Sequence, residues 1–273
     1  MLLNDGTNIW YESKKGKKQP FVFIHGNAQN HTIFTDVINA LHKKGHHTVS
    51  YDLPGHGRSE PYKNKKYSML QFAQTLQHII KQTHCQNPVI VGHSLGGMIA
   101  LQYAAAFPVH ALVLTGTADV DPIKVNNVIP LKQIVSSIVK DAYKLAEKRQ
   151  PFTFSAPMSD EQVLAAGLRC TNPDALKANF NATKRYNVRM KLSKLSCPVL
   201  IIRGRNDMLM TEKMTSDMVK RIKKVKAVQC AGGHNFFLQH KGVLHRYIMK
   251  NYRFLTSVSS PPNNTSSAYH CTL

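Results

Sequence analysis

The chain has 273 residues and a formal net charge of +21, from 36 Lys and Arg against 15 Asp and Glu. A chain of this length can bury one sizeable core and carry an inserted subdomain. Because its start shows no basic segment followed by an apolar run, and no later apolar stretch is long enough to cross a bilayer, we expect neither a signal peptide nor a membrane span and assign the protein to the cytoplasm.

The first elements are two strand-like runs at residues 8–12 and 21–24, separated by a polar, lysine-rich turn. The second run is fully apolar, as a central strand should be, and it ends in His25-Gly26-Asn27. A loop that begins in this way can present backbone N–H groups over the edge of the sheet, where they would meet a developing oxyanion. An ordinary strand-to-helix turn would have the same sequence.

A helix near residues 34–41 and a strand at residues 48–51 come next. The strand runs into residues 52–59, where two glycines and a proline among polar residues indicate a tight loop. We expect Asp52 to bind local backbone N–H groups in this loop, and His56 to have a structural role. The following helix begins at Ser68, because Ser68 and Gln71 have the spacing of a capping box.

The next strand, at residues 88–91, runs directly into Gly92-His93-Ser94-Leu95-Gly96 and then into a helical pattern. In this G-x-S-x-G form a buried strand reverses sharply into a helix, and the residue at the corner takes a strained conformation that Gly92 and Gly96 make room for. Ser94 is therefore the candidate nucleophile, with the backbone N–H of Leu95 beside its hydroxyl. The alternative is a tight turn in which the serine only caps the helix.

The alternation of strands and helices stops after a further buried strand at residues 110–116. Residues 119–190 indicate about four helices, one with apolar residues from Val125 to Ile138, one from Ala142, one capped by Ser159 and one opened by Asn172. A helical insertion at this place would lie over Ser94 as a lid. Its candidate pocket residues, each of which could equally well only hold the lid together, are Phe152, Phe154, Met158, Leu164 and Phe180.

The sheet resumes at residues 197–202, and Asp207 stands just past the carboxyl end of this strand. A last strand at residues 225–230 ends in a glycine turn that carries His234. Ser94, Asp207 and His234 each follow their own strand, in the chain order that is typical of a serine hydrolase triad on a parallel sheet. Asp119, which follows the strand at residues 110–116, is the alternative acid.

Taken together, these motifs resemble the α/β-hydrolase family over residues 5–255, in its cap-bearing esterase and lactonase branch. The motifs that carry the resemblance are His25-Gly26-Asn27, Asp52-Leu53-Pro54-Gly55-His56-Gly57-Arg58-Ser59, Gly92-His93-Ser94-Leu95-Gly96-Gly97, Gly204-Arg205-Asn206-Asp207 and Gly233-His234. The resemblance implies an α/β fold with a mostly parallel sheet and helices on both faces, formed by residues 1–118 and 197–255, and a helical cap at residues 119–196. It also implies that the N–H of Asn27 joins that of Leu95 in an oxyanion hole. Relatives that are dehalogenases or epoxide hydrolases carry aspartate at the elbow, so the serine here favours ester chemistry.

We therefore expect a serine hydrolase that cleaves a carboxylic ester or lactone of a small, largely apolar substrate through an acyl-enzyme on Ser94, with no metal or organic cofactor. His234 would be the base, and Asp207 would orient it. Two alternatives stay open: an esterase for acyl groups held by an acidic carrier protein, and a ligand receptor with slow turnover. The acyl and alcohol groups, the choice between hydrolysis and acyl transfer, and the oligomeric state do not follow from the sequence.

The basic excess is spread along the chain, with 11 basic against 6 acidic residues in 1–120, 13 against 6 in 121–196 and 12 against 3 in 197–273. This spread is typical of a solvated surface, so we expect no nucleic-acid partner and no stable membrane association.

The five cysteines have neither C-x-x-C spacing nor metal-ligand clustering, and we interpret them as reduced thiols. Residues 256–273 lack helical period and apolar mass, and we expect a disordered tail.

Overall fold

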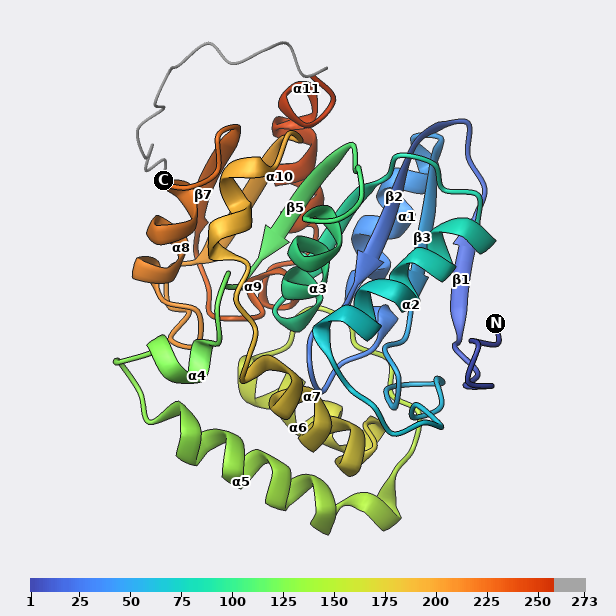
Figure 1. The fold of residues 1–273 in the computed structure, drawn as a ribbon, viewed down its shortest axis with the longest axis vertical. Coiled ribbons are helices and arrows are strands. Elements are labelled where there is room, and N and C mark those ends of the chain that lie inside the picture. Colours follow the sequence, from blue (N-terminus) through green and yellow to red (C-terminus); the bar gives the residue numbers. More distant parts are fainter. Residues whose placement is uncertain (258–273) are drawn as a thin grey trace.

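A seven-stranded sheet in the order β1-β3-β2-β4-β5-β6-β7 runs through the computed structural model, which describes residues 1–257 (Figure 1). The strands are β1 (Tyr11–Lys14), β2 (Lys18–Ile24), β3 (His46–Tyr51), β4 (Val89–His93), β5 (Ala111–Thr115), β6 (Val199–Gly204) and β7 (Val225–Cys230). Only the pair β1–β3 is antiparallel, and the other five pairs are parallel. The expected mostly parallel α/β sheet is therefore confirmed.

Consecutive side chains of the central strands enter two separate hydrophobic cores, one on each face of the sheet. In β2, Val22 and Ile24 belong to one core, and Phe21 and Phe23 belong to the other. The first core is covered by α2 (Met69–Gln82), α3 (Leu95–Ala104) and α8 (Glu212–Val219). The second is covered by α1 (Thr35–Lys43), α9 (Phe236–Gln239), α10 (Val243–Lys250) and α11 (Tyr252–Leu255).

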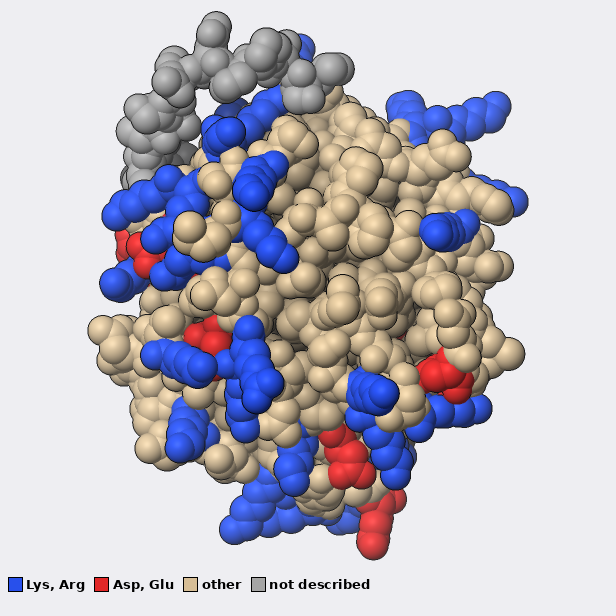
Figure 2. Space-filling model, viewed as in Figure 1, with Lys and Arg blue, Asp and Glu red and all other residues tan. Residues whose placement is uncertain are grey.

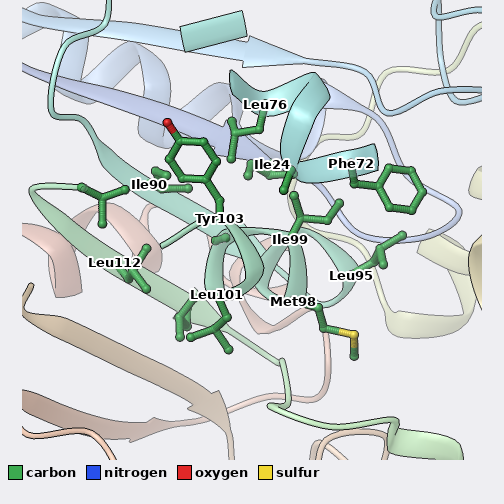
Figure 3. Close-up of a cluster of buried hydrophobic side chains, with 14 of the residues drawn as sticks. Ile24, Phe72, Leu76, Ile90, Leu95, Met98, Ile99, Leu101, Tyr103 and Leu112 are labelled. Atoms are coloured by element: carbon green, nitrogen blue, oxygen red, sulfur yellow. The ribbon is translucent and has the colours of Figure 1, made fainter. Parts of the chain in front are cut away.

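Helix α3 is apolar on nearly all sides, and it lies against the sheet between α2 and β5 (Figure 3). Leu95, Ile99 and Leu101 are all buried, and Leu76 of α2 packs in the same cluster. Burial of one such side chain stabilises the fold by about 1.5–3 kcal/mol. The helix that begins at the candidate nucleophile is therefore held firmly at its place on the sheet.

Four helices lie between β5 and β6, and we call them the cap helices. They are α4 (Pro122–Val125), α5 (Leu131–Lys144), α6 (Asp160–Cys170) and α7 (Pro173–Thr183), with 3-10 turns at Ala146–Lys148 and Arg189–Lys194. Figure 1 shows α5, α6 and α7 beyond the end of the sheet toward which β5 points. The two predicted helix starts are confirmed, because Ser159 forms a full capping box with Gln162 and Asn172 accepts from the N–H of Ala175.

Several sequence-based boundaries are wrong. Ala142 lies inside α5 and does not open a helix of its own, while Val125 ends the short α4, because Pro130 separates the two apolar segments at the N-cap of α5. The first strand begins at Tyr11 and extends to Lys14, which was expected in a turn. This shift follows from its partner: β1 pairs with β3 as the edge strand, where a lysine side chain is well tolerated.

The chain beyond residue 257 lies outside the described residues, and with it nearly all of the expected tail. Within residues 1–257, none of the helices is both long enough and apolar enough to cross a membrane. Four cysteines, Cys85, Cys170, Cys197 and Cys230, are buried free thiols, and Cys271 lies outside the described part.

Candidate active site

Ser94 occupies the corner between β4 and α3, with backbone angles φ 52° and ψ −116°. A Cβ atom at Gly92 would lie 2.5 Å from the carbonyl oxygen of Gly96, and one at Gly96 would lie 2.1 Å from that of Ile24. Both approaches are too close for any side chain, so the two glycines allow the sharp turn. The strand-turn-helix context expected for the G-x-S-x-G segment is present.

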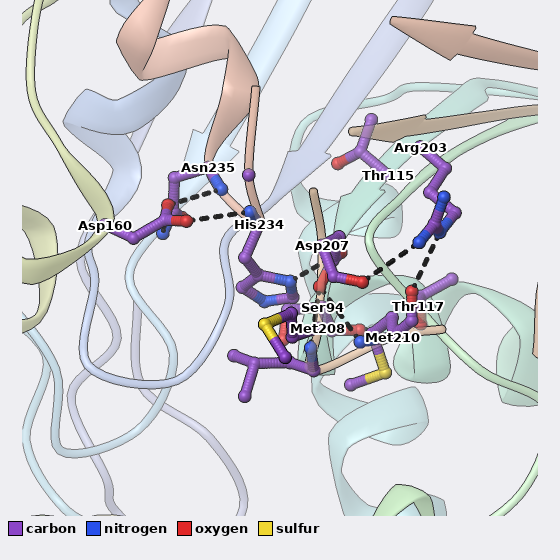
Figure 4. Close-up of polar contacts among 12 residues, drawn as sticks. Ser94, Thr115, Thr117, Asp160, Arg203, Asp207, Met208, Met210, His234 and Asn235 are labelled. Atoms are coloured by element: carbon purple, nitrogen blue, oxygen red, sulfur yellow. Dashed lines mark hydrogen bonds and ion pairs between the residues drawn. The ribbon is translucent and has the colours of Figure 1, made fainter. Parts of the chain in front are cut away.

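The side chains of Asp207 and His234 meet at the carboxyl edge of the sheet, with Nδ1 of His234 2.9 Å from Oδ2 of Asp207 (Figure 4). The other carboxylate oxygen of Asp207 accepts the backbone N–H groups of Leu209 and Met210. The buried guanidinium of Arg203 donates to the carbonyl oxygens of Asp207 and Met210. These hydrogen bonds fix the loop after β6 and occupy Oδ1 of Asp207, so that Oδ2 faces His234.

The charges around His234 favour its protonated form. Burial alone would lower the pKa of His234, but the charge and the hydrogen bond of Asp207, together with the charge of Asp160, raise it above its ordinary value. The ring of His93 lies 4.8 Å from that of His234, between centroids. Burial and the nearby charge of His234 keep the pKa of His93 well below its usual range, so His93 adds no positive charge beside the site.

Ser94 and His234 line one cavity of about 450 Å³, a size that is typical of small-molecule sites. Most of its remaining wall is apolar and comes from the cap helices and the loop after β6. The apolar lining residues are Ala28, Leu95, Met98, Pro122, Ile123, Leu131, Ile134, Val135, Ile138, Val163, Leu164, Phe180, Met208, Leu209 and Met210. Ser94 and His234 therefore line a cavity whose wall is mostly, but not wholly, apolar.

Two of the five proposed pocket residues, Leu164 and Phe180, line this cavity. The expectation is wrong for Phe152, Phe154 and Met158, which pack on the core beneath α1 and α9. The segment before α6 is bound to that core by its backbone, since the N–H of Phe154 donates to Thr32 Oγ1 and the N–H of Met158 donates to the carbonyl of Leu238.

The wall that sequence reasoning did not assign is the inner face of α5. It is formed by Leu131, Ile134, Val135 and Ile138, which follow one another at helical spacing. The helical spacing of these apolar residues was visible in the sequence. Such spacing indicates that a helix has an apolar face, but not which part of the protein that face covers.

The residues of the two candidate oxyanion donors, Leu95 and Asn27, both line the cavity. Leu95 is the first residue of α3, so its N–H has no partner within the helix. Across residues 1–257, the N–H of Asn27 also has no hydrogen-bond acceptor, whereas the preceding N–H, of Gly26, is bound to Gln29 Oε1. The side chain of Asn27 is held by Asn179 of α7, whose Nδ2 lies 2.8 Å from Asn27 Oδ1.

A second carboxylate, Asp160 at the start of α6, is bound to the loop that carries His234 (Figure 4). Its two oxygens accept the backbone N–H of His234, the backbone N–H of Asn235 and the side-chain Nδ2 of Asn235, at 2.9, 2.8 and 2.9 Å. Sequence reasoning missed Asp160. In the sequence, Asp160 is marked only by its place directly after the helix N-cap Ser159, and its hydrogen-bond partners are more than 70 residues away.

The carboxylate of Asp119 is directed elsewhere. It is fully buried and forms a bidentate ion pair with Arg189, in which its two oxygens lie 2.9 Å from Nε and 3.2 Å from Nη2. The structure thus brings Asp207, and not Asp119, to the imidazole of His234.

The loop of residues 52–59 has the expected architectural contacts. Asp52 accepts the backbone N–H groups of His31 and Arg58, which confirms its predicted role in the loop. His56 is buried beside Pro54, and burial lowers its pKa to about 3. Within the described part of the chain, no three His, Cys, Asp or Glu side chains gather as a metal ion would require.

Comparison with known proteins agrees with this architecture. A family model described as "alpha/beta hydrolase fold" matches residues 19–160. The chain is 24% identical over 249 residues to the AB hydrolase superfamily protein YisY of Bacillus subtilis, which covers 85% of this chain and 91% of that protein. It is 29% identical over 229 residues to a pimeloyl-[acyl-carrier protein] methyl ester esterase of Neisseria meningitidis, with 80% and 86% covered. Among solved structures, an esterase from Exiguobacterium antarcticum superposes with a TM-score of 0.76 at 22% identity, over 94% of this chain and 98% of that one.

Proposed function

Because the chain belongs to the α/β-hydrolase family, we propose that it is a serine hydrolase that cleaves a carboxylic ester or lactone of a small, largely apolar substrate through an acyl-enzyme on Ser94. One observation carries the proposal. Ser94 and His234 line the same, mostly apolar cavity, and Nδ1 of His234 is hydrogen-bonded to the buried carboxylate of Asp207.

The proposed first half-reaction acylates the serine. With Nδ1–H of His234 donated to Asp207, Nε2 is the nitrogen that accepts the proton of the Ser94 hydroxyl as its oxygen attacks the acyl carbon. The negative charge that forms on the carbonyl oxygen is bound by the N–H groups of Leu95 and Asn27, each worth about 3 kcal/mol of barrier. The intermediate then collapses, and His234 gives its proton to the leaving alcohol.

The proposed second half-reaction regenerates the enzyme. Water loses a proton to Nε2 of His234 and attacks the acyl carbon, the same two N–H groups bind the oxyanion, and the carboxylic acid leaves as Ser94 regains its proton. In a lactone the leaving alcohol stays attached to the acyl group, so one product with both groups is released. Apart from the substrate and water, this proposed cycle uses only side chains and backbone groups of the chain.

The walls of the cavity support an apolar acyl or alcohol group. Aliphatic and methionine side chains, many of them from α5, α6 and the loop after β6, dominate the lining. Binding an apolar group there is favourable in proportion to the area removed from water, whereas a charged group would lose hydration without a partner on most of the wall.

The test is a series of p-nitrophenyl esters of increasing acyl length, with Ser94→Ala as the control. We expect hydrolysis by the wild type and a loss of at least about a thousandfold in Ser94→Ala, with an unchanged unfolding transition. A fluorophosphonate probe should add to Ser94, as seen by peptide mass spectrometry, and should not add in the variant. Equal turnover by wild type and Ser94→Ala on every ester would rule out the proposal.

A second candidate function is hydrolysis of an acyl ester carried by an acidic protein. It is favoured by the similarity to the Neisseria esterase and by Lys184 and Arg185, two exposed residues that directly follow the cavity residue Thr183.

The third candidate is a ligand receptor with slow turnover. It predicts one rapid acylation of Ser94, followed by little further release of the chromogenic alcohol. Pre-steady-state kinetics with a chromogenic ester separates it from an enzyme, because an enzyme continues at a steady rate after any burst.

A further inference from the structure

We propose that Asp160 is a positioning residue for the catalytic histidine, through which cap helix α6 holds the loop of His234 in its working place. The inference deepens the proposed function and rests on it. It concerns a residue in the helical insertion, far in sequence from both the nucleophile and the histidine.

The contacts of Asp160 are directed at the histidine loop and not at its own helix. The N-cap of α6 is already provided by Ser159, whose side chain accepts the N–H of Gln162. Asp160 instead accepts three hydrogen bonds from His234 and Asn235. A carboxylate that accepts from N–H groups forms bonds roughly twice as strong as neutral ones, so this is a firm attachment.

The histidine loop is shaped to receive this carboxylate. A Cβ atom at Gly233 would lie 2.1 Å from Oδ2 of Asp160, so a residue with a side chain at that position would displace the carboxylate from the loop. The close approach allows the N–H of His234 to reach Oδ2 at 2.9 Å. The position of the backbone that carries the imidazole is thus set by the cap.

The same attachment extends to the other catalytic elements through Asn235. Its side-chain oxygen accepts from Gln29 Nε2 at 2.6 Å and from His93 Nε2 at 3.1 Å. Gln29 in turn accepts the N–H of Gly26, the residue before the candidate oxyanion donor Asn27. A displacement of Asp160 would therefore be transmitted to the histidine loop, the nucleophile strand and the oxyanion loop together.

The charge of Asp160 acts in the same direction as its geometry. The ionisable groups around His234 are Asp207 at its Nδ1, Asp160 at its backbone, the neutral His93 beside its ring, and Glu161, which lines the same cavity. Asp207 and Asp160 both raise the pKa of His234 against the effect of burial. Removing the charge of Asp160 should therefore lower the pKa of His234. A residue that only held the loop in place would not have this effect.

The test compares Asp160→Asn with Asp174→Asn. Asp174 is also an acidic residue in the first turn of a cap helix, where it accepts from the Tyr143 hydroxyl. An amide at position 160 turns one acceptor into a donor that faces a backbone N–H, so we expect kcat to fall about 10- to 100-fold with KM within about twofold. The apparent pKa on the acid side of the kcat/KM profile should fall as well, and Asp174→Asn should match the wild type in all three quantities.

A second readout does not need turnover. The ring of His234, followed by NMR through a pH titration, should titrate at a lower pH in Asp160→Asn than in the wild type, and as in the wild type in Asp174→Asn. If the wild type hydrolyses no ester, the proposed function fails, while the titration still decides the role of Asp160. Wild-type kcat together with an unshifted titration in Asp160→Asn, or the same losses in Asp174→Asn, would overturn the inference even if the unfolding temperature drops.

Discussion

The imidazole of His234 is bound to Asp207 across the loops that follow β7 and β6, with 2.9 Å between Nδ1 and Oδ2. Asp119, a buried acid that follows β5, is instead paired with Arg189. The two carboxylates are therefore distinguished by their partners: one faces an imidazole, which changes its protonation in the proposed reaction, and the other faces a permanent cation.

This difference predicts opposite effects of two similar substitutions. Asp207→Asn should lower kcat by about 10⁴-fold with little change in KM, because the amide no longer fixes the imidazole tautomer or stabilises the imidazolium. Asp119→Asn should leave kcat near the wild-type value and lower the free energy of unfolding by about 1.5–3 kcal/mol, because it removes a charge-assisted pair. Ester kinetics and urea denaturation of both variants measure the two effects. A large loss of kcat in Asp119→Asn with none in Asp207→Asn would assign the acid to the strand before the cap.

The parts of the site that the sequence predicted are those set by local rules. Ser94 could be found because Gly92 and Gly96 leave room for the sharp reversal of a strand into a helix. Asp207 and His234 could be placed beside it because parallel strands end at one edge of the sheet.

The parts that could not be predicted depend on contacts across the chain. Nothing in residues 150–158 indicates that the backbone of Met158 binds Leu238 and so turns Phe152 and Phe154 away from the cavity. The three bonds from Asp160 to His234 and Asn235 also join residues that no periodic pattern relates. Such contacts are determined by how the cap sits on the sheet, and the sequence carries no local signal for that.

The raised pKa of His234 predicts the pH dependence of the reaction. The base must be neutral to accept the serine proton, so kcat/KM should fall as the pH drops through the pKa of His234 in the free enzyme. Because the charges of Asp207 and Asp160 raise that pKa against burial, the midpoint should lie above the ordinary histidine value of about 6.5. A kcat/KM profile with a neutral ester measures it directly. A midpoint clearly below that value would show that burial outweighs the two carboxylates.

Two buried neutral histidines predict a loss of stability in acid. Burial lowers the pKa of His25 to about 4 and that of His56 to about 3. Between these values and about 6.5 the unfolded chain binds protons that the folded chain does not, so the free energy of unfolding should decrease as the pH falls, by up to about 1.4 kcal/mol per pKa unit for each histidine.

Urea denaturation at pH 7 and pH 5 tests this in His56→Asn. The variant should lose less stability between the two pH values than the wild type, because one buried proton acceptor is gone. The control is His84→Asn, at an exposed position whose positive φ asparagine tolerates, and it should keep the wild-type slope. An unchanged slope in His56→Asn would contradict the prediction.

The inner face of α5 predicts which residues set the acyl length. Val135 lines the cavity, and Ser137 is exposed on the same helix. Val135→Phe should fill part of the cavity and shift the preference among p-nitrophenyl esters toward shorter acyl groups, because one methylene in an apolar pocket is worth about 10- to 200-fold in kcat/KM. Acetate hydrolysis should stay within about threefold of the wild type. Ser137→Phe adds the same ring outside the cavity and should leave the preference unchanged. A shift in both variants, or in neither, would mean that α5 does not form the wall for the acyl group.

The basic surface predicts how the reaction responds to salt. Lys and Arg are scattered over the face shown in Figure 2, over α8 and β7 as well as over the cap helices, with other residues between them. Exposed charges act over about 8 Å at physiological salt, so they can steer an acidic protein but scarcely affect a neutral ester.

For a small, neutral ester we therefore expect kcat/KM to stay nearly constant from low to high salt, in the wild type and in the double variant Lys184→Ala/Arg185→Ala. Those two residues are exposed and follow Thr183 in the cavity wall, so a docked carrier protein would contact them first. The matched control is Lys220→Ala/Lys223→Ala, which removes two exposed charges beyond the end of α8. If a carrier-bound acyl ester is turned over far faster than its free counterpart, and if this advantage collapses with added salt and in the Lys184/Arg185 variant but not in the control, the substrate is delivered by a protein and the cap is its docking face.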